Sequence, residues 1–295
     1  MNALNADMFR VRNETDKMLD KVLAFTTKDY ERIIDAMRYA TIGGGKAFRP
    51  LLVALVAELY ELKRSVVAKI GTAIEMVHSY SLIHDDLPCM DNDIMRRGKA
   101  TTHIRYGEAT AVLAGDALLT QAFILLSEHE TGFSSAHRVK LIHLLAEAAG
   151  ANGMIGGQMM DILGEKTPLT FEQIETMQRL KTGALIRFSC IAPAIAANAE
   201  QHEIDALTKY ADALGRLFQL TDDLLDEEAD AAFLGKSVGK DRQAGKSTFI
   251  GKLGIEETRR LARQCAHEAQ QALAPFGNRS HKLFELINIV LNRKK

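Results

Sequence analysis

Two short acidic segments are the first candidates for chemistry in this sequence. The first runs from His84 to Asp93 (HDDLPCMDND) and holds four aspartates. It follows an apolar stretch, Ile74 to Ile83, that has the composition of a buried helix. Aspartate is unfavourable inside helices, and like charges at this spacing repel one another. Taken alone, the segment indicates either a solvated acidic turn or a site that binds a cation.

The second segment, Gln219 to Asp226 (QLTDDLLD), repeats this pattern of an acidic pair beside apolar residues. On a helix Asp222 and Asp226 lie one turn apart and share a face, so both carboxylates can point to one place. Two such segments predict carboxylates facing a cavity, neutralised by a divalent cation. Carboxylate oxygens suit a hard ion, most of all Mg²⁺, which takes its remaining ligands from water and substrate phosphates. A phosphorylated substrate is therefore expected.

Basic residues gather beside both acidic segments. Lys46 and Arg49 lie in a glycine-rich turn, Gly43 to Pro50 (GGGKAFRP), whose N–H groups can hold an anion at the start of a helix. Arg96 and Arg97 follow the first segment, and planar guanidinium groups match phosphate oxygens. Further lysines lie inside a helical segment or after the second acidic segment: Lys181, Lys236, Lys240 and Lys246. Each alone is best explained as a solvated charge, but their joint placement indicates phosphate binding.

One pattern suggests a different chemistry. Glu75 and His78 form a Glu-x-x-His motif, as found in the di-iron sites of helix bundles. Such sites need the motif twice, and the sequence has no second copy. His78 is therefore interpreted as a helix histidine or a phosphate contact, not as an iron ligand.

Helical patterns dominate the chain. Apolar residues recur at three- and four-residue spacing in segments that predict helices, roughly 51–62, 66–86, 108–128, 136–150, 170–197, 202–228, 255–275 and 280–293. Thr170 and Gln173 have the spacing of a capping box at a helix start. The glycine-rich sites Gly43–Gly45 and Gly156–Gly157 are expected to punctuate helices, and no alternating run predicts a strand. The sequence therefore predicts an all-α fold, a single domain over residues 1–295 built as a bundle of about ten helices.

The bulk composition limits the classes of partner. The 295 residues carry a formal net charge of −1, so neither nucleic acid nor an anionic membrane is favoured. Cys89, Cys190 and Cys265 are odd in number and widely spaced, which favours a reducing compartment over a disulfide framework. The N-terminus has no apolar signal core, and no apolar run is expected to approach the ~20 residues of a membrane span. A cytoplasmic protein without a membrane span is therefore expected.

The assembled motifs resemble those of the trans-isoprenyl diphosphate synthases, in particular their bacterial farnesyl diphosphate synthase type. The resemblance runs from about Thr41 to Lys295 and comprises HDDLPCMDND with RRG, GEATAVLAGDALLTQAF, GGQMMD, KTGALIRFS, FQLTDDLLD and GKSTF. It implies the all-α isoprenoid synthase fold, a homodimer, and a deep cavity flanked by both aspartate motifs. The implied reaction joins isopentenyl diphosphate head to tail to dimethylallyl or geranyl diphosphate and releases pyrophosphate.

The resemblance also implies roles for single residues. Asp85 and Asp91 would hold two ions of a trinuclear Mg²⁺ cluster, for which Mn²⁺ can substitute, with support from Asp86. Asp222 would hold the third ion, with Asp226 nearby. The set for isopentenyl diphosphate would be Lys46, Arg49, His78 and Arg97. The set for the allylic diphosphate would be Arg96, Lys181, Lys236 and Lys246, with Thr182 and Gln219 turning their dipoles toward the cationic carbon.

Two features depart from the family pattern or leave alternatives open. The family usually has a basic residue where Ala47 stands and commonly an acidic one where Ile94 stands, which is expected to weaken binding at most. The basic C-terminus, Arg293 to Lys295, resembles a tail that closes over isopentenyl diphosphate, and a solvated terminus is the alternative.

Product length is expected to depend on the residues before the first aspartate motif. Tyr80 and Ser81 are the fifth and fourth residues before Asp85, and an aromatic ring here would act as the floor of the cavity. Farnesyl diphosphate is therefore the predicted product, with geranylgeranyl or geranyl diphosphate as the alternatives. A non-catalytic synthase subunit is disfavoured because both aspartate motifs are intact. A terpene cyclase is disfavoured because it would not need a second diphosphate site.

Overall fold

The computed structural model describes residues 3–25, 28–129, 132–232 and 248–293. The chain forms two compact units. Unit 1 comprises Met1–His143 with Ile195–Ala197, and unit 2 comprises Leu144–Ala194 with Asn198–Lys295. The first aspartate motif lies in unit 1 and the second lies in unit 2.

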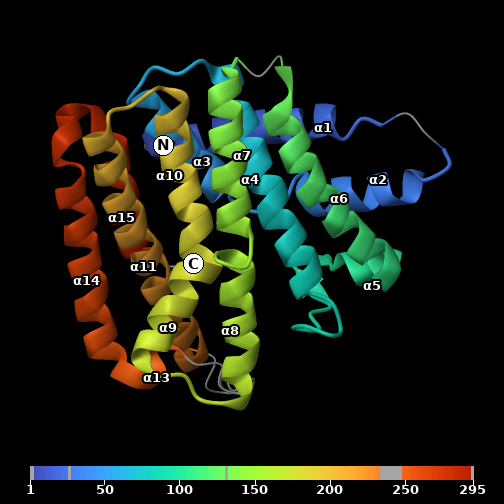
Figure 1. The fold of residues 1–295 in the computed structure, drawn as a ribbon. Coiled ribbons are helices and arrows are strands. Elements are labelled where there is room, and N and C mark those ends of the chain that lie inside the picture. Colours follow the sequence, from blue (N-terminus) through green and yellow to red (C-terminus); the bar gives the residue numbers. More distant parts are fainter. Residues whose placement is uncertain (1–2, 26–27, 130–131, 233–247, 294–295) are drawn as a thin grey trace. The chain divides into compact units, whose positions relative to one another are not determined.

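Unit 1 is built mainly from helices, which Figure 1 shows in blue to green. Its elements are α1 (Ala3–Val22), α2 (Glu31–Thr41), α3 (Phe48–Glu58), α4 (Arg64–Asp85), β1 (Met95–Arg96), β2 (Lys99–Ala100), α5 (Thr102–Tyr106), α6 (Glu108–Ser127) and most of α7 (Ser135–Ala149). Helix α4 packs against α1, α2, α3 and α6. It is the central helix of the unit, which explains why its middle turns, Ile70 to Val77, are buried on all sides.

A two-residue hairpin follows the first aspartate motif. Met95 pairs with Ala100 and Arg96 with Lys99 in an antiparallel register. The two residues between the strands, Arg97 (φ 53°) and Gly98 (φ 75°), both have positive φ, as a type I′ turn requires. The sequence did not predict these strands, because they are too short to show an alternating pattern. The hairpin determines where Arg96 and Arg97 lie.

Unit 2 consists of the last residues of α7 and the helices that follow. Its elements are α8 (Met154–Lys166), α9 (Phe171–Gln178), the π-helical turn η2 (Arg179–Gly183), α10 (Ala184–Ala196), α11 (Gln201–Ala232), α13 (Phe249–Leu253), α14 (Ile255–Ala272), the 3₁₀ segment η3 (Ala274–Ser280) and α15 (His281–Leu291). Figure 1 shows α14 (red) running beside α15, and α11 packs against both of them. The 32-residue helix α11 carries the second aspartate motif.

The predicted helices agree with the structure, with some omissions. Helices α1, α2, α5, α8 and α13 were not among the predicted segments. The prediction that Gly156–Gly157 punctuates helices is wrong, because both glycines lie inside α8. The segment predicted as one helix over 170–197 contains the π-helical turn η2. The capping box is confirmed: the N–H of Gln173 donates to Thr170 Oγ1, and the N–H of Thr170 donates to Gln173 Oε1 (2.8 Å).

Helix α6 corrects the expectation about apolar runs. It is 20 residues long with a mean hydropathy of 1.7, so by length and composition it could cross a membrane. Its acidic residues Glu108 and Asp116 make it look interrupted, but the alanines and leucines between them keep the average high. A core helix of a soluble protein passes the same test, and α6 packs against α2, α4 and α5.

Candidate functional site

The first aspartate motif forms a hydrogen-bonded loop at the end of α4. The helix ends at Asp85, and the chain then turns through residues 87–90. The N–H of Asp91 donates to the carbonyl of Asp85 (2.8 Å), and the N–H of Asn92 donates to that of Leu87 (3.1 Å). This loop brings the two residues predicted to share metal ions, Asp85 and Asp91, next to each other. Asp91 is exposed and Asp85 is half-buried, so a ligand can reach both.

Asp86 lies in a different environment from Asp85 and Asp91. It is 3% exposed, and Arg96 Nε donates to its Oδ1 at 2.6 Å. Burial raises the pKa of the Asp86 carboxyl, although the hydrogen bond and the charge of Arg96 oppose the rise. Arg96, predicted to bind the allylic diphosphate, therefore lies directly on the aspartate motif. This position fits the supporting role that the sequence assigned to Asp86.

Three of the four residues predicted for isopentenyl diphosphate, Arg49, His78 and Arg97, come together in unit 1. His78 lies on α4 two turns before Asp85, and its pKa is well below the usual value because it is buried beside the charges of Arg49, Arg97 and Arg96. The imidazole is therefore neutral near pH 7. The structure thus gathers His78 with three of the predicted phosphate-binding arginines, including both from the hairpin.

The glycine-rich turn between α2 and α3 lies against Arg97. Gly45 has a φ of +68°, a conformation that favours glycine, and a Cβ there would lie 2.4 Å from the Arg97 guanidinium carbon, so the arginine side chain would have to shift. Lys46 is exposed, and Arg49 lies in the first turn of α3. A small pocket of about 120 Å³ is lined by Gly43–Gly45 together with Asp86, Arg96 and Arg97. Ala47, one of the departures from the family pattern, is 3% exposed in a left-handed conformation.

Tyr80 and Ser81 lie one turn before the first aspartate motif on α4. Tyr80 is 4% exposed, and its ring meets the His84 ring edge to face with centroids 5.7 Å apart. Burial and then the charge of Asp85 raise the pKa of Tyr80 to about 12, so its hydroxyl is neutral at pH 7. Ser81 Oγ donates to the carbonyl of His78 (2.9 Å). A buried aromatic ring thus lies one turn before Asp85, and its role as the floor of a cavity stays a prediction.

The second aspartate motif lies on α11 in unit 2. Burial raises the pKa of Asp222 to about 6; the charge of Arg293 opposes this rise, and the charge of Asp226 adds to it. Gln219 Nε2 donates to Asp222 Oδ2 at 3.4 Å. Asp223 has a structural role, because its Oδ2 accepts the N–H of Phe249 at the start of α13 (2.8 Å). The pair on one face is thus Asp222 and the exposed Asp226, as predicted.

Arg293 is anchored on the second motif. Its Nη2 lies 2.7 Å from Asp222 Oδ1 and donates to Thr221 Oγ1 (2.8 Å) and to the carbonyl of Phe218 (2.6 Å). Its guanidinium carbon lies 4.1 Å from the centroid of the Phe218 ring. The interpretation of this residue as a solvated terminus is therefore wrong. Its attachment to Asp222 depends on tertiary packing and has no local signal in the sequence.

Lys181 and Thr182 lie in the π-helical turn η2, a kind of distortion that is frequent at functional sites. Lys181 Nζ lies 2.6 Å from Asp161 Oδ2 on α8. The two elements meet closely because Gly157 has no side chain: a Cβ there would lie 2.2 Å from the backbone nitrogen of Lys181. Sequence reasoning missed Asp161, although it ends the GGQMMD motif one turn after Gly157. Lys236, Lys240 and Lys246 lie outside the described residues.

The carboxylates of each unit fit a hard divalent ion. Within the described ranges, no group of three or more His, Cys, Asp or Glu side chains could hold a metal by itself. Each motif instead offers two carboxylates: Asp85 and Asp91 in unit 1, and Asp222 and Asp226 in unit 2. Such oxygen donors do not make a structural zinc site, and they suit Mg²⁺, which completes its shell with waters and substrate phosphates.

A larger cavity in unit 2 holds none of the predicted residues. It has a volume of about 1130 Å³ and lies between α9, α11 and α14. Charged residues of both signs line it, among them Glu175, Lys209, Asp212 and Arg216. This cavity is therefore not part of the site that the sequence predicts.

Comparisons with known proteins define the class. A family model described as "Polyprenyl synthetase" matches residues 30–276. The chain therefore belongs to the polyprenyl synthetase family, and it is an enzyme of the prenyltransferase class. The farnesyl diphosphate synthase of Bacillus subtilis (strain 168) is 40% identical over 259 residues, 88% of this chain and 88% of the relative. The chloroplastic geranylgeranyl pyrophosphate synthase of Catharanthus roseus is 39% identical over 290 residues, 98% of this chain and 81% of the relative.

A solved structure supports the same class. The crystal structure of an apo FPP/GFPP synthase from Zymomonas mobilis matches with a TM-score of 0.89 and 39% sequence identity, covering 98% of both chains. The predicted all-α isoprenoid synthase fold is confirmed by this likeness. Because the relatives named for farnesyl and for geranylgeranyl products are almost equally similar, product length has to be argued from the residues.

Proposed function

We propose that the protein is a Mg²⁺-dependent farnesyl diphosphate synthase that condenses isopentenyl diphosphate with dimethylallyl or geranyl diphosphate. The observation that carries this proposal is the arrangement along α4. This helix presents His78 to Arg49 and Arg97 and, two turns later, ends in Asp85 and Asp86 beside Arg96. One rigid element thus bears both a diphosphate-binding set and a metal-binding set, as a reaction between two diphosphates needs.

The first role of the chain is to bind the allylic diphosphate and help it to leave. Asp85, Asp91 and Asp222 would hold the ions, with Asp86 and Asp226 in support. Bound Mg²⁺ supplies charge that makes diphosphate a better leaving group. Arg96 and Lys181, with Lys236 and Lys246, would hold the diphosphate oxygens. Arg96 and Lys181 are paired with Asp86 and Asp161 here, so each carboxylate keeps its cation oriented.

The second role is to hold isopentenyl diphosphate while its double bond attacks the allylic cation. Lys46, Arg49 and Arg97 would carry the charge, and neutral His78 would contribute a hydrogen bond. Thr182 and Gln219 would turn their oxygen dipoles toward the cationic carbon. The released pyrophosphate accepts the proton that the product loses, so no protein base is assigned. The buried setting of α4 would exclude water that would otherwise hydrolyse the cation.

Farnesyl diphosphate is proposed as the product because of Tyr80. A buried ring on the helix that carries Asp85 would stop the growing chain after three isoprene units. Geranylgeranyl and geranyl diphosphate are the alternatives, and product analysis separates all three.

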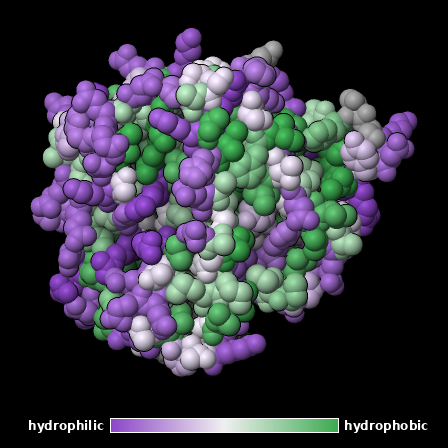
Figure 2. All heavy atoms as spheres, in the orientation of Figure 1, coloured by the Kyte–Doolittle hydropathy of each residue, from purple (hydrophilic) through white to green (hydrophobic). Residues whose placement is uncertain are grey.

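A cytoplasmic homodimer is the proposed assembly. Helix α6 exposes the large apolar side chains Val112, Leu113 and Ile124, which a second copy of the chain would cover. Figure 2 shows hydrophobic residues reaching the surface among hydrophilic ones on one face of the protein. Light scattering after gel filtration would measure the mass of the assembly, and a monomer would contradict this part of the proposal.

The test is a product assay. Purified protein receives Mg²⁺, isopentenyl diphosphate and either dimethylallyl or geranyl diphosphate, and the products are sized after dephosphorylation. A fifteen-carbon alcohol is expected from both primers. No elongation would favour a non-catalytic subunit, and a cyclic hydrocarbon formed without isopentenyl diphosphate would favour a terpene cyclase.

Variants of the aspartates test the site. Asp85→Asn and Asp222→Asn should lower turnover by roughly 100-fold or more, because each removes a charge that binds metal. Circular dichroism should show that the helices are retained. Near-normal turnover in both variants would contradict the metal assignment.

A further inference from the structure

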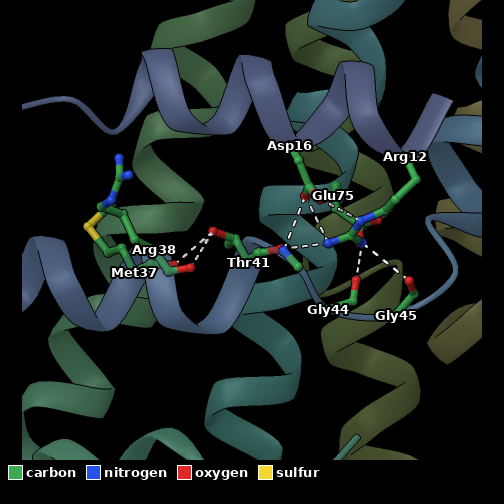
Figure 3. Close-up of polar contacts among 9 residues, drawn as sticks. Arg12, Asp16, Met37, Arg38, Thr41, Gly44, Gly45 and Glu75 are labelled. Carbon is green, nitrogen blue, oxygen red and sulfur yellow. Dashed lines mark hydrogen bonds and ion pairs between the residues drawn. The ribbon is translucent and has the colours of Figure 1, made fainter. Parts of the chain in front are cut away.

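The N-terminal helix α1 contacts the glycine-rich turn through Arg12. Arg12 donates hydrogen bonds to the carbonyls of Gly44, Gly45 (3.4 Å) and Thr41 (3.3 Å). Its side chain is only 13% exposed. Figure 3 shows its guanidinium group reaching from α1 to the two glycines. One arginine therefore binds three backbone carbonyls at the end of α2 and in the turn that follows.

Asp16 completes this contact from the next turn of α1. It pairs with Arg12 Nη2 at 2.8 Å, and its Oδ1 accepts the N–H of Gly43 at 3.3 Å. The carboxylate thus orients the arginine and also binds the turn directly. Figure 3 shows both side chains extending from α1 to the same turn.

The carbonyl contacts determine which way the N–H groups of the turn point. No peptide bond in the described chain is cis, and in a trans peptide the carbonyl and the N–H point in opposite directions. When Arg12 binds the carbonyls of Gly44 and Gly45, it turns the N–H groups of Gly45 and Lys46 away from α1. Every second residue of the turn, Gly43, Gly45 and Ala47, has positive φ, a pattern that presents successive N–H groups to an anion.

Glu75 joins Arg12 to the other arginines of the site. Its carboxyl is 2% exposed, its Oε1 lies 3.9 Å from Arg12 Nη1, and among the described residues its Oε2 has no hydrogen-bond partner. Arg49 and Arg97 are the other cations that act on it. The Glu-x-x-His motif of α4 thus places the Glu75 carboxyl among three arginines, whose charges oppose the rise in its pKa that burial causes, and His78 lies one turn further on.

We propose that Arg12 is a positioning residue for the isopentenyl diphosphate site. It binds the carbonyls of the glycine-rich turn on the side that faces α1. The turn's N–H groups and the neighbouring side chains of Arg49 and Arg97 therefore face the diphosphate. Asp16 and Glu75 orient Arg12. The inference rests on the proposed function, and it adds a residue of α1 that touches no substrate.

The decisive experiment replaces Arg12 with glutamine. The KM for isopentenyl diphosphate should rise about tenfold, whereas kcat and the KM for geranyl diphosphate should stay within about twofold. Arg12→Lys should lie between wild type and Arg12→Gln, because one ammonium group replaces the planar fork. Hydrogen exchange of the amides in residues 42–48 should be faster in Arg12→Gln.

Arg10 provides a matched control on the same helix. It pairs with Asp7 (2.8 Å) and Glu14 (3.3 Å) on α1 and with Glu58 at the end of α3 (3.5 Å), and among the described residues it makes no hydrogen bond or ion pair with the turn. Arg10→Gln should leave both KM values and the exchange of residues 42–48 unchanged. Equal changes in both KM values, or the same effect from Arg10→Gln, would mean that Arg12 only stabilises the fold, and the proposal would be wrong.

Calorimetric titration with isopentenyl diphosphate separates this inference from the proposed function. Binding requires no turnover, so wild-type protein that binds but does not elongate would contradict the function alone. A dissociation constant in Arg12→Gln within about twofold of wild type would overturn the inference even if the synthase is active. If Arg12→Gln does not fold, Asp16→Asn is measured in its place, with a rise of about threefold expected.

Discussion

Replacing Tyr80 with alanine should lengthen the product. The ring is 4% exposed and is held edge to face against His84, one turn before Asp85. The phenol ring is larger than one five-carbon isoprene unit, so its removal leaves room for a further unit. The expected result is a shift from farnesyl toward geranylgeranyl diphosphate.

The size of this shift follows from packing. In the wild type, a fourth unit would have to push aside a buried ring, and overpacking of a core costs about 1–3 kcal/mol or more. Removing that cost alone should raise the ratio of twenty-carbon to fifteen-carbon product about 5- to 150-fold. Burial of the added carbons, at about 0.8 kcal/mol each, acts in the same direction. The variant should also lose about 3 kcal/mol of stability, so the assay is run well below its melting temperature.

The assay is sizing of the dephosphorylated products by gas chromatography with geranyl diphosphate as primer. Tyr80→Phe is the matched control, because it keeps the ring and removes only a hydroxyl that is neutral at pH 7. Its product should remain farnesyl diphosphate. An unchanged fifteen-carbon product from a folded Tyr80→Ala protein would refute the idea that this ring limits the chain.

Three further predictions test pKa, close packing and capping. Because the pKa of Asp222 is raised to about 6 from 3.8, the free energy of unfolding should fall as the pH rises from about 4 to about 6. Urea unfolding with EDTA measures the difference in free energy of unfolding between wild type and Asp222→Asn. Over this pH range the difference should change by about 1 kcal/mol, allowing for a side chain that is 40% exposed. A difference that does not change with pH would contradict the raised pKa. Gly157→Ala should lower the melting temperature and raise the KM for the allylic diphosphate, because the added Cβ would lie 2.2 Å from the backbone nitrogen of Lys181. If both values are unchanged, α8 and η2 can move apart without cost. Thr170→Ala should cost about 1 kcal/mol in urea unfolding through loss of the capping box, and a changed product length would contradict a purely local role.

The sequence by itself determined the helical architecture of most of the chain and both aspartate motifs. These features are local: periodic apolar residues indicate a helix, and Asp222 and Asp226 share a face because they lie one turn apart. The structure places His78 beside Arg49 and Arg97, and their joint role in binding isopentenyl diphosphate stays a prediction. Helix α1 was missed because it is largely polar on its exposed sides, and α8 because its glycines suggested a break.

Only the tertiary structure decided which partners the charged residues take. Arg12 binds a turn some thirty residues away, Lys181 on η2 pairs with Asp161 on α8, and Arg293, just after α15, pairs with Asp222 on α11. No local pattern marks these pairs, because they depend on how helices cross and not on spacing along one helix. The same holds for Gly157, whose lack of a side chain matters only because η2 lies against it. The sequence thus identified the candidate site residues, and the packing of distant helices decided which partners hold those that the structure describes.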